Sequence, residues 1–149
     1  MLSSMTPREA FIFAQKMRTD LEDELIEIRA ESLIQSLGLE SCSDKQIGDG
    51  LRPGELKRVS IGYELVTNPS LLMLDEPTSG LDSVSALAIA KLLKKEAKRG
   101  LTIIATIHTP SAETFLQFDR CMLLADGYTI YNGSPKLIRS YFESKGFMF

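Results

Sequence analysis

The stretch Leu71-Leu72-Met73-Leu74-Asp75-Glu76-Pro77-Thr78-Ser79-Gly80-Leu81-Asp82 is the most informative part of this 149-residue sequence. Its first four residues form a short apolar run, which is typical of a strand buried on both faces. Asp75 and Glu76 follow at the carboxyl end of that strand. Adjacent carboxylates suit phosphoryl chemistry, because one can hold a hydrated magnesium ion while the next orients or deprotonates an attacking water. The competing interpretation is a strand end with solvated acids that turns at Pro77.

The residues that follow this stretch predict an α/β fold. Residues 83–99 have a helical pattern, and residues 101–107 form a second apolar run that predicts another buried strand. Strand, helix and strand in this order predict a right-handed crossover between parallel strands, and ligands collect at the carboxyl ends of such strands. Asp75, Glu76 and His108 all fall at those ends.

The residues before the stretch predict three helices. Thr6 and Glu9 match a capping box with Pro7 at the first helical position, which predicts a helix through about residue 17. Residues 21–37 have apolar residues near helical period, and Gly38 is a plausible C-cap. The predicted apolar side of this second helix is Leu21, Leu25, Ile26, Ile28, Leu33, Ile34 and Leu37. A third helix is expected from residue 53 to about residue 65, before Asn68-Pro69.

The carboxyl-terminal residues predict a hairpin and a helix. Residues 121–125 are expected to form a third buried strand, and Asp126-Gly127 favours a tight turn into residues 128–131. Ser134 as N-cap and Pro135 predict a last helix through about residue 142.

Composition limits the class of protein. The chain is 44% hydrophobic and 25% charged, which predicts one globular domain. A net charge of -3 gives no electrostatic basis for binding nucleic acid. Cys42 and Cys121 match neither a zinc-ligand spacing nor a disulfide framework. The sequence shows no signal peptide and no apolar run of membrane-spanning length, so the chain by itself is expected to be cytosolic.

The stretch quoted above resembles the Walker B and D-loop block of ATP-binding cassette (ABC) proteins. The resemblance implies that Asp75 lies on the magnesium side, through water, and that Glu76 is the general base. It also implies that the D-loop, Ser79, Gly80, Leu81 and Asp82, touches a partner cassette. Without the resemblance, Asp82 is interpreted as the N-cap of the next helix. His108 stands where the family has its switch histidine, which senses the γ-phosphate; a lone histidine is otherwise a packed or surface residue.

A second segment resembles the signature of the family but departs from it. Leu51-Arg52-Pro53-Gly54-Glu55 stands where the usual pattern is Leu-Ser-Gly-Gly-Glu. The resemblance places ATP contacts at Arg52, Pro53, Gly54 and Glu55, yet Arg52 lacks the serine hydroxyl and Pro53 lacks a backbone donor. The pair Lys57-Arg58 that follows is typical of the G subfamily; by itself it would be interpreted as a solvated helix face.

The resemblance extends over residues 1–149 and implies a partial cassette. The fold class is α/β, a partial P-loop NTPase-like ABC cassette with a parallel sheet flanked by helices. Residues 1–68 would be the helical and signature subdomain. Residues 69–149 would hold Walker B, the D-loop, the switch histidine, and a hairpin and helix at the carboxyl end. No Gly-x4-Gly-Lys-Ser/Thr pattern occurs. We therefore expect a truncated cassette that does not hydrolyse ATP alone.

The resemblance also implies a function. It predicts an ATP- and Mg2+-dependent cassette of a G-subfamily transporter that drives export at the cytoplasmic face of a membrane. Its partners would be a second cassette and a transmembrane domain, with no nucleic acid. The alternative is a non-catalytic or regulatory fragment that docks on an intact ABC subunit. A chromosome-maintenance ATPase of the same fold is disfavoured by the Lys57-Arg58 pair, the lack of long heptads and the acidic charge.

Overall fold

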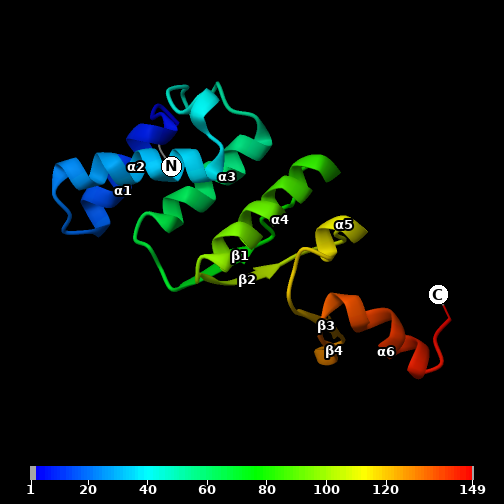
Figure 1. The fold of residues 1–149 in the computed structure, drawn as a ribbon. Helices are drawn as coiled ribbons and strands as arrows, with labels where there is room; N and C mark the ends of the chain where they lie inside the picture. Colours follow the sequence, from blue (N-terminus) through cyan, green and yellow to red (C-terminus); the bar gives the residue numbers. More distant parts are fainter. Residues whose placement is uncertain (1–2, 149) are drawn as a thin grey trace. The chain divides into compact units, whose positions relative to one another are not determined.

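The computed structural model describes residues 3–148 and divides into two compact units after His108 (Figure 1). The elements of the first unit are α1 (Pro7–Arg18), α2 (Asp23–Leu37), the 3-10 helix η1 (Glu40–Cys42), α3 (Pro53–Leu65), β1 (Leu71–Asp75), α4 (Ser83–Lys98) and β2 (Thr102–Thr106). Those of the second are α5 (Ala112–Phe115), β3 (Cys121–Ala125), β4 (Tyr128–Gly133), the 3-10 helix η2 (Pro135–Leu137) and α6 (Ile138–Ser144). The subdomain boundary near residue 68 stays a prediction.

The ends of the first helices confirm the predicted caps. Thr6 Oγ1 accepts a hydrogen bond from the Glu9 amide at 3.2 Å, and the Glu9 carboxylate accepts one from the Thr6 amide at 2.9 Å. Pro7 occupies the first position of α1, where no amide donor is needed. Gly38 ends α2 with a φ of 63°, the left-handed conformation that glycine adopts without steric cost.

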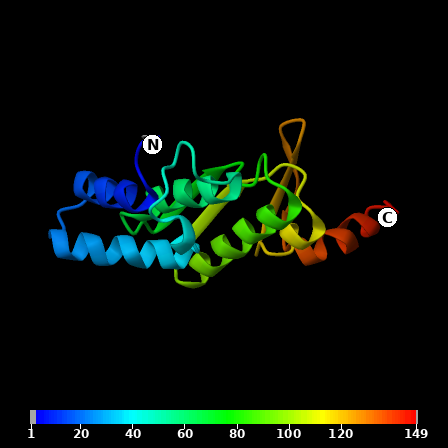
Figure 2. The same cartoon turned by 90° about the horizontal axis from the view of Figure 1, so that it is seen from above.

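The packing of α2 corrects the predicted apolar side of this helix. Its buried residues are Ile26, Ala30, Ile34 and Leu37, which recur at helical spacing. Leu25 and Ile28, predicted to face the core, are 47% and 59% exposed. The sequence contains two overlapping apolar stripes, and contact with α1 and α3 buries only one of them. Figures 1 and 2 show α1 lying alongside α2.

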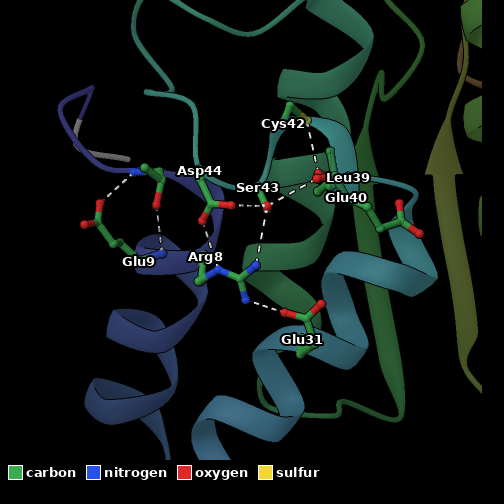
Figure 3. Close-up of polar contacts among 9 residues, drawn as sticks. Arg8, Glu9, Glu31, Leu39, Glu40, Cys42, Ser43 and Asp44 are labelled. Atoms are coloured by element: carbon green, nitrogen blue, oxygen red, sulfur yellow. Dashed lines mark hydrogen bonds and ion pairs between the residues drawn. The ribbon is translucent and has the colours of Figure 1, made fainter.

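Arg8 ties α1 to α2 and to the loop that follows η1 (Figure 3). Its guanidinium forms an ion pair with Glu31 of α2 and donates to the Asp44 carboxylate at 3.0 Å. The Ser43 hydroxyl also donates to Asp44, at 2.8 Å. Hydrogen bonds from Ser43 and then Arg8 lower the pKa of Asp44, because they favour its ionised form. This network holds the start of the loop that leads to α3.

The pairing of β1 with β2 confirms the parallel crossover. The two strands are parallel, with Leu71 opposite Thr102 and Asp75 opposite Thr106, and α4 connects them. Leu72 is 5% exposed and belongs to the core that the helices share. The next residue, Met73, is 70% exposed and lies opposite Ile104, which is 53% exposed. Within the first unit the prediction of strands buried on both faces is therefore wrong, because the helices of this unit cover only one face.

The second unit confirms the predicted hairpin. β3 and β4 are antiparallel, and the turn residues Asp126 and Gly127 have φ values of 50° and 79°. Two successive positive φ values characterise a tight turn that matches the twist of the strands. The prediction of a third buried strand is wrong, since β3 pairs with β4 among residues 3–148 and its Leu124 is 67% exposed.

The end of the second unit differs from the predicted single helix. A 3-10 turn, η2, precedes α6, and the Ser134 side chain makes no capping hydrogen bond to it. The Ser134 carbonyl instead accepts a hydrogen bond from the Tyr131 hydroxyl at 2.7 Å. No helix in residues 3–148 combines the length and the apolar character needed to cross a membrane. Cys42 and Cys121 are both free thiols.

Candidate functional site

The carboxyl ends of β1 and β2 bring the predicted acids to one edge of the sheet. Asp75 is the last residue of β1 and lies opposite Thr106, the last residue of β2. The Thr106 hydroxyl donates to Asp75 Oδ1 at 2.5 Å and accepts from the Glu76 amide at 3.0 Å. A single side chain of β2 thus contacts both acids that follow β1.

The backbone of Glu76 leaves the strand in an unusual conformation. Its φ is 45°, in the left-handed region that a residue with a side chain adopts only where its surroundings hold it there. The Glu76 carbonyl accepts hydrogen bonds from the Ser79 amide at 3.1 Å and from Lys57 Nζ at 3.3 Å. Together with the bond to Thr106, these contacts fix the turn that presents the Glu76 carboxylate beyond the strand.

His108 leaves the sheet at the same edge as the acids. It follows the last residue of β2 by two positions and is exposed. Thr109, the next residue, has a φ of 44°, in the left-handed region. The structure therefore places Asp75, Glu76 and His108 at neighbouring strand ends, as the sequence predicts. The γ-phosphate role of His108 stays a prediction.

The predicted D-loop is a turn between β1 and α4. Ser79 and Gly80 are exposed, and Gly80 has a φ of 74° with open space around it. Leu81 packs against the core, which anchors the loop. The Asp82 carboxylate accepts hydrogen bonds from the amides of Val84 at 3.1 Å and Ser85 at 3.3 Å, so the predicted N-cap is confirmed.

The four residues at the signature position form the start of α3. Pro53 is its first residue, and the Glu55 carboxylate accepts from the Arg52 amide at 2.8 Å. Gly54 faces α4: a Cβ there would lie 3.6 Å from the Ser85 side chain. The start of α3 therefore lies against the first turn of α4, next to the D-loop, while the Arg52 residue is exposed.

Lys57 and Arg58 are half-buried, so their interpretation as a solvated helix face is wrong. Arg58 donates to the carbonyls of Gly38 at 2.9 Å and Leu37 at 3.3 Å. These carbonyls end α2, and a cation is favourable at the negative end of a helix. Lys57 reaches Glu76, as described above. No local pattern in the sequence indicates either contact, because both contacts join residues from different elements.

Thr106 is a residue of the site that the sequence analysis missed. A hydroxyl residue at the end of a strand has no distinctive local pattern, since threonine is common in strands. The parallel register supplies the missing information, because it places Thr106 opposite Asp75. Thr106 could have been predicted from the sequence only if the register between the two parallel strands had also been predicted.

The donor set suits a magnesium ion that also binds phosphate. Among residues 3–148, no group of three or more histidine, cysteine, aspartate or glutamate side chains could hold a metal alone. Mg2+ usually keeps several waters and takes one or two carboxylates plus phosphate oxygens, so an exposed carboxylate such as Asp75 fits this role. A cavity of about 420 Å³ lies at the other end of the strands, beside Ser70 and Leu101, and is not part of this site.

Comparison with known proteins gives one consistent family. The family described as ABC transporter matches residues 2–79. ABC transporter G family member 13 of Arabidopsis thaliana is 42% identical over 153 residues, which cover 99% of this chain and 23% of that protein. The broad substrate specificity ATP-binding cassette transporter ABCG2 of Mus musculus is 41% identical, with 98% and 23% covered. The chain thus spans about a quarter of the length of these relatives.

Solved structures of cassettes share the fold. The cbiO1 protein of Clostridium perfringens, part of the ABC transporter complex cbiONQ, superposes with a TM-score of 0.81 at 32% identity over 95% of this chain and 55% of that one. The ADP conformation of MJ1267, an ATP-binding cassette of an ABC transporter, gives a TM-score of 0.76 at 23% identity, covering 93% and 60%. The second likeness concerns the fold alone.

Proposed function

Because the chain belongs to the ABC transporter family, with relatives in its G family, we propose that it contributes to ATP hydrolysis that drives export across a membrane. The observation that carries this proposal is the meeting of Asp75, Glu76 and Thr106 at the carboxyl ends of two parallel strands. Ligands of open α/β sheets bind at such ends.

The proposed roles follow from the chemistry of the side chains. Asp75 would hold the magnesium ion through a bound water, and Glu76 would accept a proton from the attacking water. His108 donates a hydrogen bond to the terminal phosphate. Magnesium bound to ATP would neutralise charge that develops on the phosphate oxygens. The turn at Glu76 supports this division of roles, because its fixed backbone lets consecutive carboxylates face different targets.

Two exposed segments are proposed to face a second cassette. The D-loop, Ser79 to Asp82, and the start of α3, Arg52 to Glu55, lie on adjacent helix starts within the first unit. A second nucleotide bound by the partner would then meet the amides at the start of α3. Arg52 replaces the usual serine there, and its guanidinium can contact a phosphate through charge-assisted hydrogen bonds.

The proposal requires two further parts of the transporter, a phosphate-binding loop and a transmembrane domain, that are not among these 149 residues. The sequence has no Gly-rich loop with a lysine, so the triphosphate would be cradled by a segment not included here. In the proposal, a transmembrane domain would convert closure of two cassettes into transport, and this chain would lie at the cytoplasmic face of the membrane.

The second candidate is a regulatory fragment that docks on an intact cassette without catalysis. The observation that favours it is the Arg52-Pro53 pair at the signature position, where Pro53 supplies no amide to a phosphate. The docking surface would be the same D-loop and helix start, so the two proposals differ in chemistry rather than in place.

The experiment is magnesium-dependent ATP binding by calorimetry and hydrolysis by phosphate release. Both are measured on the complete gene product, whatever its length, and on the 149-residue chain. Catalysis by Glu76 predicts that Glu76→Gln binds ATP normally and hydrolyses it at least about 100-fold more slowly, the usual contribution of a general base. Glu27→Gln, on the exposed part of α2, is the matched control.

The outcomes separate the two candidates. Hydrolysis by the gene product that depends on Glu76 supports the ATPase. Absence of nucleotide binding by the gene product, together with binding to an intact G-type cassette, supports the docking fragment instead. A Glu76→Gln variant that hydrolyses ATP at the unsubstituted rate would remove Glu76 from the mechanism.

A further inference from the structure

The Thr106 hydroxyl acts as the donor in one hydrogen bond at the site and as the acceptor in another. Its hydroxyl donates to Asp75 Oδ1 at 2.5 Å and accepts from the Glu76 amide at 3.0 Å. The first distance is in the range of charge-assisted bonds between a hydroxyl and a carboxylate, which are roughly twice as strong as neutral ones. The second bond holds the amide of the residue whose φ is 45°.

We propose that Thr106 is the positioning residue that orients both Asp75 and Glu76 for magnesium and water, an inference that rests on the proposed ATPase function. The donated proton engages one oxygen of the Asp75 carboxylate, which fixes the plane of that carboxylate. The hydrogen bond that the Thr106 hydroxyl accepts holds the Glu76 amide in place. Hydrogen bonds from Lys57 Nζ and the Ser79 amide hold the Glu76 carbonyl. Thr106 itself touches neither nucleotide nor water in this role.

The hydroxyl, and not the methyl group, carries the proposed role. β2 is already joined to β1 along its whole length by backbone pairing from Leu71–Thr102 to Asp75–Thr106. The side chain of Thr106 is therefore not needed to hold the strands together. Thr102 lies four residues earlier on the same exposed face of β2, at the other end of the strand, and is the matched control.

The test compares Thr106→Val, Thr106→Ser and Thr102→Val in the complete gene product. The readouts are Mn2+ affinity in the presence of ATP, by electron paramagnetic resonance, and kcat and KM for ATP. A hydrogen bond to a charged group is worth about a factor of ten or more, so Thr106→Val should weaken Mn2+ binding and lower kcat by about tenfold or more, with KM changed less than about threefold. Thr106→Ser should restore both values, and Thr102→Val should change neither.

A third readout needs no nucleotide. Hydrogen exchange of the Glu76 amide should speed up in Thr106→Val and not in Thr106→Ser, because the acceptor is lost only in the former. Melting curves from circular dichroism show whether each variant folds, and Thr106→Ala replaces the valine variant if that one does not.

Each outcome decides the inference. If the unsubstituted protein is active and Thr106→Val has the same Mn2+ affinity and kcat, the positioning role of Thr106 is overturned while the proposed function stands. Equal losses in Thr106→Val and Thr106→Ser would also overturn it, because the methyl group would then be the cause. If the unsubstituted protein neither binds Mn–ATP nor hydrolyses ATP, the proposed function and the positioning role are overturned together. Loss in Thr106→Val with rescue by Thr106→Ser is the result we expect.

Discussion

Asp82 is both the last residue of the predicted D-loop and the N-cap of α4. Its carboxylate caps α4 by accepting from the amides of Val84 and Ser85. Its pKa is lowered, chiefly because the Ser85 side chain and backbone donate to the ionised carboxylate. The geometry of the D-loop is therefore linked to the charge of one residue, and this link has a measurable dependence on pH.

The lowered pKa of Asp82 predicts that the folded protein loses stability in acid. Because its pKa is lower in the folded state than in the unfolded state, its stabilisation is complete above the ordinary aspartate pKa of about 4 and is lost as pH falls through the lowered value. Asp82→Asn should therefore unfold more easily than the parent protein at pH 7, and the difference should shrink as the pH falls below the ordinary aspartate pKa of about 4. Urea unfolding at several pH values measures it, with Asp49→Asn as control. A difference that stays constant with pH would contradict the prediction.

Three helices of the first unit come close together at Gly62 of α3. A Cβ placed there would lie 2.4 Å from Phe11 Cζ of α1 and 2.5 Å from Leu37 Cδ1 of α2. Both neighbours are fully buried, so neither can move aside freely. The absence of a side chain at Gly62 lets three helices share one core, and this core holds the start of α3 in place beside α4.

Gly62→Ala is predicted to destabilise the protein in spite of the helix preference of alanine. Overpacking a buried contact typically costs about 1–3 kcal/mol, which exceeds the gain of about 0.5–1 kcal/mol from replacing a helical glycine. Urea unfolding measures the change in the free energy of unfolding. Gly54→Ala in the same helix is the control, because its added Cβ stays at an ordinary 3.6 Å from Ser85. Equal stability of Gly62→Ala and the parent would contradict the packing argument.

At the scale of the first unit as a whole, the parallel pair has one face that no helix of that unit covers. Leu71, Met73 and Ile104 on this face are 48%, 70% and 53% exposed. Exposed apolar residues that are contiguous on a sheet mark a contact surface or an aggregation site. Asp75 and Glu76 lie at the carboxyl end of the same pair of strands, so this face adjoins the proposed site.

The 149-residue chain is predicted to self-associate through this face. Met73→Lys should lower the association, because it places a charge in the centre of the apolar surface. Met17→Lys is the matched control, since Met17 is also 70% exposed but lies on α1. Analytical ultracentrifugation over a concentration series measures the association. Equal behaviour of the two variants would mean that association, if present, uses another surface.

Local sequence patterns predicted most elements of this fold. The Thr6 capping box, the left-handed Gly38, the Asp126-Gly127 turn and the Asp82 cap were all confirmed, because each depends on residues within about one turn of each other. The acids at the end of β1 and His108 after β2 were also placed correctly, since the parallel crossover brings the ends of both strands to one edge.

The sequence by itself determined the starts of the first helices and of α4, the tight turn of the hairpin, and which carboxylates stand at a strand end. Capping, turns and hydrophobic period act over short distances, so local patterns encode them. Only the tertiary structure decided which stripe of α2 is buried, that one face of β1 and β2 is open, and that Lys57 and Thr106 hold Glu76. These features depend on contacts between residues far apart in the chain. Such contacts form only after the elements pack, so no local pattern encodes them.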